Sequence, residues 1–132
     1  MPTYARALDS YHRTQVQAST PLEQVVMLYD AAVRFMGDAR GAIERKDIPA
    51  RRQAISRTLA IVGELRSTLD MNRGGEIAAS LDDLYGYVMR RLLDAAMHQD
   101  AAAIDDACRV FDTLRDAWRT IAQAATASGS AA

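Results

Sequence analysis

Two apolar runs with helical spacing, separated by a pair of glycines, constrain the fold of this 132-residue chain most strongly. The first run ends with Leu65 and Leu69, and Gly74-Gly75 follows after a polar stretch. Glycine ends a helix at low cost because it has no Cβ that disfavours the left-handed conformation. Glu76 then falls in the first turn of a new helix, where the helix dipole favours a negative charge. The centre of the chain is therefore predicted to be a helical hairpin. The second run consists of Ile77, Leu81, Leu84, Tyr85 and Val88.

An earlier helix is predicted to begin at Thr20 and to end near Arg45. Thr20 can cap it, Pro21 suits the first helical position, and Glu23 completes a capping box. Apolar residues then recur at helical spacing, which predicts that this face lies in the core. They are Leu22, Val25, Val26, Tyr29, Val33, Met36 and Ile43.

Two further signals complete a set of four helices. Asp47-Ile48-Pro49 breaks the chain and caps a second helix, which ends near Leu69. The third helix ends near His98, and Asp100 can cap the fourth. Four long helices with short connections predict an all-α fold, an antiparallel four-helix bundle over residues 19–125. The small and polar residues 126–132 are expected to be disordered. The apolar stripe of the second helix is Ile55, Leu59, Val62, Leu65 and Leu69, with Ile61 at its edge, and that of the last is Ile104, Ala107, Cys108, Phe111, Leu114, Trp118 and Ile121.

Residues 1–18 form a polar arm with a few apolar residues. Tyr4, Leu8 and Tyr11 keep helical spacing, but so short a helix is unstable alone in water. The arm is therefore either mobile or docked on the bundle.

The composition excludes several classes of protein. Lys and Arg total 16 against 17 Asp and Glu, so no global field indicates nucleic acid or an anionic membrane. A single cysteine forms no intrachain disulfide and fits a reducing compartment. No apolar run approaches the roughly 18 residues of a membrane span. A cytoplasmic protein without membrane insertion is expected.

No motif for catalysis or cofactor binding is present, so a non-enzyme without a cofactor is expected. Asp94 and His98 lie one helical turn apart, but two ligands without a third indicate a surface pair rather than a metal site. Cys108 lies on the apolar face of its helix, which favours packing over reactivity. Solvated faces explain the charged pairs Arg51-Arg52, Arg90-Arg91 and Asp82-Asp83.

More apolar surface is present than one core needs. Tyr85, Met89, Leu93 and Met97 form a row at i, i+4 spacing on the third helix, Tyr87 flanks the opposite edge, and Ile61 and Leu65 widen the stripe of the second helix. Either the bundle twists enough to bury this surface, or an external groove binds an apolar helix. The methionines mildly favour the groove because their side chains adapt to a partner. The chain's own arm is an alternative occupant.

Several motifs, in register over residues 11–118, resemble the flagellar secretion chaperone family FliS. These motifs are the run from Ala18 to Asp30, the turn from Leu69 to Ala78, Leu81-x-x-Leu-Tyr-x-Tyr87, Arg91-Leu92, and Leu114 to Trp118. Two positions depart from the family pattern. Ala31 stands where glycine is usual and is an easy replacement inside a helix, and Ala96 stands where asparagine is common, so a polar contact of that residue is absent.

The resemblance implies a cytoplasmic, non-enzymatic chaperone dedicated to flagellin. Members of the family bind the disordered C-terminal segment of flagellin, prevent early polymerisation and assist its delivery to the flagellar type III export apparatus. The arm resembles a plug on the apolar site, and Leu8 and Tyr11 match its apolar positions. The expected partner-binding residues are Leu8, Tyr11, Ile61, Leu65, Tyr85, Tyr87, Met89, Leu93 and Met97.

Two other functions compete with this interpretation. A histidine phosphotransfer bundle needs an exposed histidine in the middle of a helix, whereas His98 stands at a helix end beside Asp100, which opposes a phosphoryl group. A flagellar regulator with a client other than flagellin is the second alternative. Apolar grooves also favour weak homodimers of the client-free protein.

Overall fold

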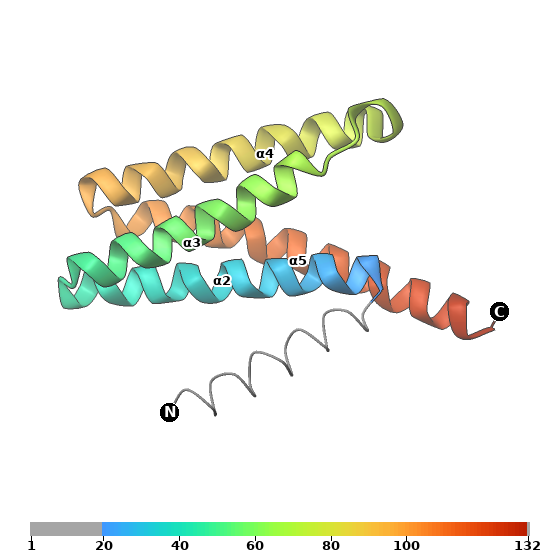
Figure 1. The fold of residues 1–132 in the computed structure, drawn as a ribbon, viewed down its shortest axis with the longest axis horizontal. Helices are drawn as coiled ribbons and strands as arrows, with labels where there is room; N and C mark the ends of the chain where they lie inside the picture. The colour runs from blue at the N-terminus through green and yellow to red at the C-terminus, as the bar shows by residue number, and fades with distance from the viewer. Residues whose placement is uncertain (1–19, 132) are drawn as a thin grey trace, which may run out of the picture.

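The computed structural model describes residues 20–131, which form four helices. They are α2 (Pro21–Arg45), α3 (Ile48–Ser67), α4 (Met71–His98) and α5 (Ala101–Ala131). Consecutive helices run in opposite directions, and α2 and α4 each pack against both α3 and α5 (Figure 1). The predicted antiparallel four-helix bundle is therefore confirmed, whereas the N-terminal arm lies outside the described residues.

Capping side chains begin the helices as the sequence predicts. The Thr20 hydroxyl accepts a hydrogen bond from the Glu23 backbone N–H at 3.1 Å, and Pro21 occupies the first helical turn. Asp47 caps α3 by accepting from the Ala50 N–H at 3.2 Å. These bonds satisfy N–H groups that have no partner inside the helix.

Two turns of the same form close one end of the bundle, which we call the two-turn end. Lys46 ends α2 at φ 58° and Gln99 ends α4 at φ 53°, both in the left-handed region. Each is followed by a capping aspartate, Asp47 or Asp100, and Asp100 accepts from the Ala102 N–H at 3.0 Å. Figure 1 shows the α2–α3 and α4–α5 turns at the same end of the bundle.

The connection between α3 and α4, at the opposite end, differs from the prediction. We expected the helix break at Gly74-Gly75 and the next helix from Glu76. The break does occur at Gly75, at φ 52° and ψ −126°, but a helical turn that starts at Met71 behind the cap Asp70 precedes it. The positive φ explains the glycine, because side chains rarely adopt this conformation. Gly75 thus separates a short helical turn from the main part of α4, which continues from Glu76 as predicted.

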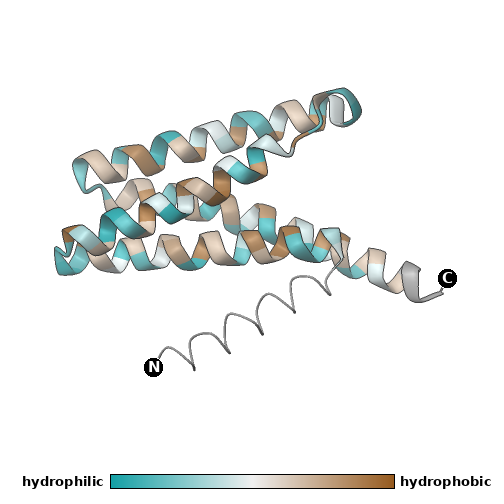
Figure 2. Cartoon of the chain, in the orientation of Figure 1, coloured by the Kyte–Doolittle hydropathy of each residue, from teal (hydrophilic) through white to brown (hydrophobic). Residues whose placement is uncertain are grey.

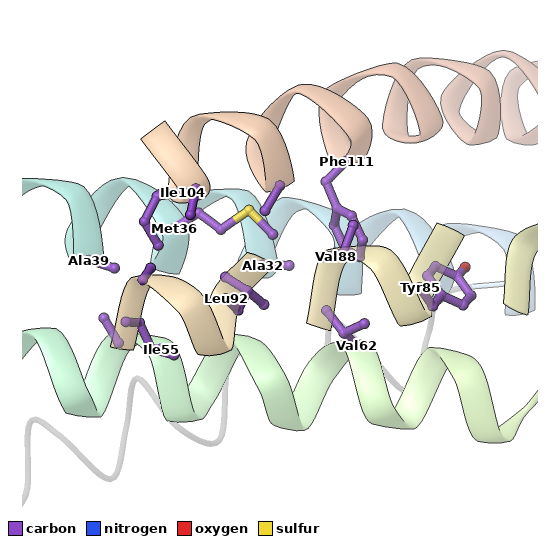
Figure 3. Packing of buried hydrophobic residues seen from close by; sticks show 14 of the residues in the cluster. Ala32, Met36, Ala39, Ile55, Val62, Tyr85, Val88, Leu92, Ile104 and Phe111 are labelled. Carbon is purple, nitrogen blue, oxygen red and sulfur yellow. The ribbon is translucent and has the colours of Figure 1, made fainter. Parts of the chain in front are cut away.

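The core runs along the bundle axis and receives side chains from all four helices (Figure 3). Tyr29 and Phe111 are fully buried, and their ring centroids lie 4.7 Å apart. Each helix carries both hydrophobic and hydrophilic residues along its length (Figure 2), as expected for the amphipathic helices of a bundle. The largest buried side chains are Tyr29, Tyr85, Phe111, Met36, Leu92, Ile104, Val62 and Val88.

Several expectations about individual residues are wrong. Ile77, Leu84 and Ile121 were assigned to core stripes, but they are 74%, 37% and 48% exposed because they lie near helix ends or at the edge of the stripe. Arg51 was placed on a solvated face, but it is buried. Helix α5 extends to Ala131, and the expected disorder of residues 126–132 stays a prediction.

Candidate functional site

A groove of about 490 Å³ lies between α4 and α5. Leu84 and Tyr87 line it from α4, and Val110 and Leu114 line it from α5. Leu84 and Tyr87 are 37% and 38% exposed. They are three residues apart on a helix and therefore point to the same side. We call this pair, with the groove beside it, the α5-side edge of α4.

A second apolar row follows the other side of α4. Met89, Leu93 and Met97 recur at i, i+4 spacing, and their exposure increases toward the end of the helix. Met89 is half-buried, with its sulfur 3.9 Å from Nη1 of Arg66 on α3. Leu93 and Met97 are exposed. We call this row the α3-side edge of α4. Exposed large apolar residues on two edges of one helix indicate contact with an apolar partner.

A smaller cavity of about 240 Å³ opens at the α3–α4 end of the bundle. All four helices line it, with Val25 from α2, Leu65 from α3, Leu81 from α4 and Trp118 from α5. Residues of the kinked first turn of α4, among them Gly74, also line it.

Two tyrosines place hydroxyl groups in this apolar end of the core. Tyr85 lines the cavity, and its hydroxyl lies 2.5 Å from that of Tyr29. Burial raises the pKa of both tyrosines above the ordinary value, and the bond to Tyr85 adds to the effect on Tyr29. Both hydroxyls therefore stay neutral and act as structural hydrogen-bonding groups.

The structure divides the predicted partner-binding residues into three groups. Tyr87, Leu93 and Met97 are exposed on the edges of α4. Ile61 and Met89 are half-buried against the core. Leu65 and Tyr85 are 4% and 2% exposed, so Tyr85 does not turn away from the core as the i, i+4 row suggested. The remaining two residues, Leu8 and Tyr11, lie outside the described residues.

Sequence reasoning missed the part of the site that Leu84 and Ile77 contribute. Both fit the stripe of Val88, and periodicity alone assigned them to the core. The spacing of Leu84 and Tyr87, three residues apart and flanking the stripe, was the available signal for a second edge. Ile77 follows the kink at Gly75, and a sequence pattern does not predict how a kink directs the next turn.

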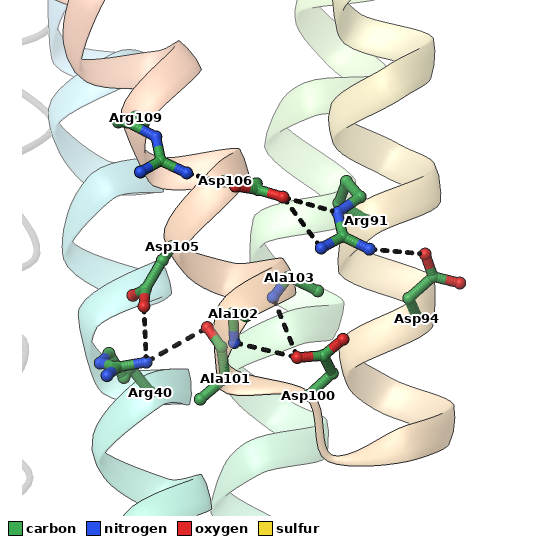
Figure 4. A network of polar contacts seen from close by, with 10 residues as sticks. All are labelled: Arg40, Arg91, Asp94, Asp100, Ala101, Ala102, Ala103, Asp105, Asp106 and Arg109. Carbon is green, nitrogen blue, oxygen red and sulfur yellow. Dashed lines mark hydrogen bonds and ion pairs between the residues drawn. The ribbon is translucent and has the colours of Figure 1, made fainter.

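Ion pairs connect α4 and α5 beside the groove (Figure 4). Arg91 donates to Asp106 at 2.9 Å and to Asp94 at 3.2 Å, and Arg109 contacts the other oxygen of Asp106. The hydrogen bond from Arg91 lowers the pKa of Asp106, so this carboxylate stays charged at neutral pH. Asp106 and Arg109 line the groove, which gives an apolar surface a polar border.

Residues 20–131 contain no group of three or more His, Cys, Asp or Glu side chains that could hold a metal ion. The predicted surface pair of Asp94 and His98 is at the end of α4, where Asp94 bonds to Arg91. Burial raises the pKa of the half-buried Cys108 thiol, which opposes thiolate reactivity. In this part of the chain, no helix is apolar over a length sufficient to span a membrane.

Comparison with known proteins identifies the family. Residues 4–125 match the family described as "Flagellar protein FliS". The chain is 35% identical over 112 residues to the flagellar secretion chaperone FliS of Salmonella typhimurium, covering 84% of this chain and 83% of the relative. It is 31% identical over 117 residues to the flagellar secretion chaperone FliSB of Pseudomonas aeruginosa, covering 86% of this chain and 93% of the relative. The flagellar secretion chaperone FliS of Campylobacter jejuni is 34% identical over 115 residues, covering 87% of this chain and 90% of the relative. The chain belongs to the FliS family of flagellar proteins.

Proposed function

We propose that this protein is a cytoplasmic, non-enzymatic chaperone that binds the disordered C-terminal segment of flagellin. The observation that carries the proposal is the pair of exposed apolar edges on α4, with Leu84 and Tyr87 on one side and Leu93 and Met97 on the other. An amphipathic segment that buries its apolar face only in the filament needs a temporary cover. Apolar edges on both sides of one helix, one of them beside a groove, offer such a cover to a client that wraps around it.

The expected mechanism is folding of the client on binding. Each leucine or methionine side chain that leaves water contributes about 1.5–3 kcal/mol. Ordering a disordered segment costs about 2–5 kcal/mol of this gain, which keeps the complex reversible. The bound segment is then prevented from polymerising early and is released at the flagellar type III export apparatus. This mechanism requires neither a nucleotide nor a metal.

The N-terminal arm is proposed to act as a gate. Leu8 and Tyr11 belong to a segment that joins the bundle at Thr20, the N-cap of α2, and Val25, one turn into this helix, lines the cavity at the α3–α4 end. In this proposal the arm covers apolar surface in the free protein and yields to the client. Unchanged flagellin affinity in a Leu8→Ala, Tyr11→Ala variant would exclude a gate.

The direct test is calorimetric titration with a peptide that covers the last few tens of residues of the flagellin from the same organism. We expect a complex near one to one, with a Kd of about 1 µM or tighter, and a gain of helical circular dichroism on mixing. Absence of both heat and spectral change would contradict the proposal. If flagellin does not dominate a pull-down from motile cells, the protein serves another client instead.

A further inference from the structure

A second groove, of about 310 Å³, lies between α2 and α3, away from both edges of α4. Small residues form part of its lining, Gly37 and Gly41 from α2 and Ala50 and Ala54 from α3. A Cβ atom added at Gly37 would meet nothing within 4 Å. Phe35 lines the same groove and is half-buried. Side chains of moderate size from another molecule therefore have room to enter.

Arg45 and Arg57 line this groove, and the guanidinium group of Arg34 lies beside it, over the ring of Phe35. The guanidinium groups of Arg34 and Arg57 lie 5.3 Å and 5.6 Å from the ring centroid of Phe35. An Nη of Arg45 lies 3.1 Å from the position that a Cβ of Gly41 would take. We call Arg34, Arg45 and Arg57 with this cavity the arginine groove.

These arginines lack carboxylate partners, in contrast to most others. Within residues 20–131, neither Arg34, Arg45 nor Arg57 forms an ion pair, and the single carboxylate of the groove, Asp38, forms none either. Two positive charges and one negative charge therefore line the groove, and Arg34 adds a positive charge beside it. The arginines with carboxylate partners are Arg40, Arg66, Arg73, Arg91, Arg109, Arg115 and Arg119.

We propose that the arginine groove binds an acidic amphipathic segment of a partner protein, at a site separate from the client edges of α4. Guanidinium groups bind carboxylates through paired, charge-assisted hydrogen bonds, which gives orientation as well as affinity. The space above Gly37 admits an apolar side chain of the same segment. The complementary partner therefore presents carboxylates next to an apolar residue of moderate size.

The geometry favours a protein partner over nucleic acid. Single-stranded nucleic acid gains affinity when its bases stack on aromatic rings. Here the guanidinium groups of Arg34 and Arg57 lie over the Phe35 ring, where a base would stack.

The test is a titration of the full chain followed through its amide NMR signals, with two synthetic probes. One is a helical peptide of about 20 residues with glutamates at i, i+4 spacing between leucines, and the other carries lysine in place of each glutamate. A single-stranded DNA oligomer is the third probe. We expect saturable shifts at Gly37, Gly41 and Gln53 with the acidic peptide alone, and weaker binding at higher salt.

Two variants on one helix provide a matched comparison. Arg57 lines the groove, whereas Arg52 does not, and both are exposed and without an ion pair within the described chain. Arg57→Glu should weaken the acidic peptide about tenfold, and Arg52→Glu, with the same change of charge, should leave its affinity within about twofold. Gly37→Leu fills the groove without removing charge and should also abolish the shifts.

Three results would overturn the proposal. These are absence of saturable shifts at the groove, an equal loss of affinity in Arg57→Glu and Arg52→Glu, and preferential binding of the oligomer. The flagellin peptide serves as a separate readout for the edges of α4. Because the two sites share no residues, Arg57→Glu should leave flagellin affinity unchanged even if the acidic probe fails to bind.

Discussion

The hydroxyl groups of Tyr29 and Tyr85, 56 residues apart in the chain, meet at 2.5 Å inside the bundle. Their bond joins α2 to α4, which pack against common neighbours rather than against each other. Tyr29→Phe leaves the buried Tyr85 hydroxyl without its partner. We expect it to lower the free energy of unfolding by about 1–3 kcal/mol in denaturant titrations. The control Tyr87→Phe changes an exposed ring and should have little effect.

The same pair predicts loss of stability at alkaline pH. Burial raises the pKa of Tyr29 and Tyr85 in the folded state, so the native protein holds protons that the unfolded chain releases near pH 10, the ordinary value for tyrosine. The stabilisation is thus complete below about pH 10 and is lost as the pH rises further. Spectrophotometric titration should detect ionisation of these two tyrosines together with unfolding. Ionisation while the bundle stays folded would contradict their burial.

Replacement of Gly75 tests the kink in α4. At φ 52° and ψ −126° an alanine is strained, although its Cβ would have open space. We expect Gly75→Ala to lower the free energy of unfolding by about 1–3 kcal/mol. Gly63→Ala, at a helical position with equally open space, should raise it by about 0.5–1 kcal/mol. Equal effects at the two positions would show that the backbone conformation of Gly75 carries no cost.

The buried Arg51 is expected to reduce stability. Its side chain is buried, and its Nε has no hydrogen-bond partner in the structure. Arg51→Met keeps most of the volume and removes the buried charge, so it should raise the free energy of unfolding by about 1 kcal/mol. Arg52→Met, at the exposed neighbour, should change it by less than about 0.5 kcal/mol. Thermal melts of both variants would measure the difference, and destabilisation by Arg51→Met would show that the charge has a partner that stabilises it.

Substitution of one residue on each edge of α4 tests the client surface. Leu84→Ser and Met97→Ser remove exposed apolar groups, so folding should be nearly unaffected. If the client covers them, each variant loses about 1.5–3 kcal/mol of binding, which is about tenfold or more in Kd. Titration with the flagellin peptide measures this loss, and Arg52→Ser serves as a control on another helix. Unchanged affinity in both variants would exclude the edges of α4 as the binding surface.

Periodicity and capping residues predicted the four helices because both signals depend on neighbouring residues. The short connections between the helices then predicted their antiparallel arrangement. Thr20, Asp47 and Asp100 cap as expected, since an N-cap depends on a few neighbouring residues. The α3–α4 connection was less accurate. Gly74-Gly75 was correctly recognised as a break in regular geometry, but Asp70 had already started the helix. The cap Asp70 therefore determines where this helical segment begins, ahead of the glycine pair.

The candidate site was predicted less well because exposure depends on how helices pack together. Tyr85 falls within the i, i+4 row of Met89 and Leu93, yet its hydroxyl finds Tyr29 on another helix and the side chain is buried. No local pattern contains that long-range bond. The unpaired state of Arg57 has the same cause, since it depends on the absence of a carboxylate nearby in space rather than in sequence.

The two turns of identical form at one end have a mechanical consequence. Lys46-Asp47 and Gln99-Asp100 each combine a left-handed residue with a cap, so sliding of one joined helix along the other would break hydrogen bonds in both turns. We therefore expect any movement of the helices to open the bundle about this end, as about a pivot. The opposite end holds the kink at Gly75 and the cavity beneath it. A small rotation about the two-turn end separates the helices more widely at the end that holds Gly75. The bundle could then enlarge its cavity without changing the register of any helix.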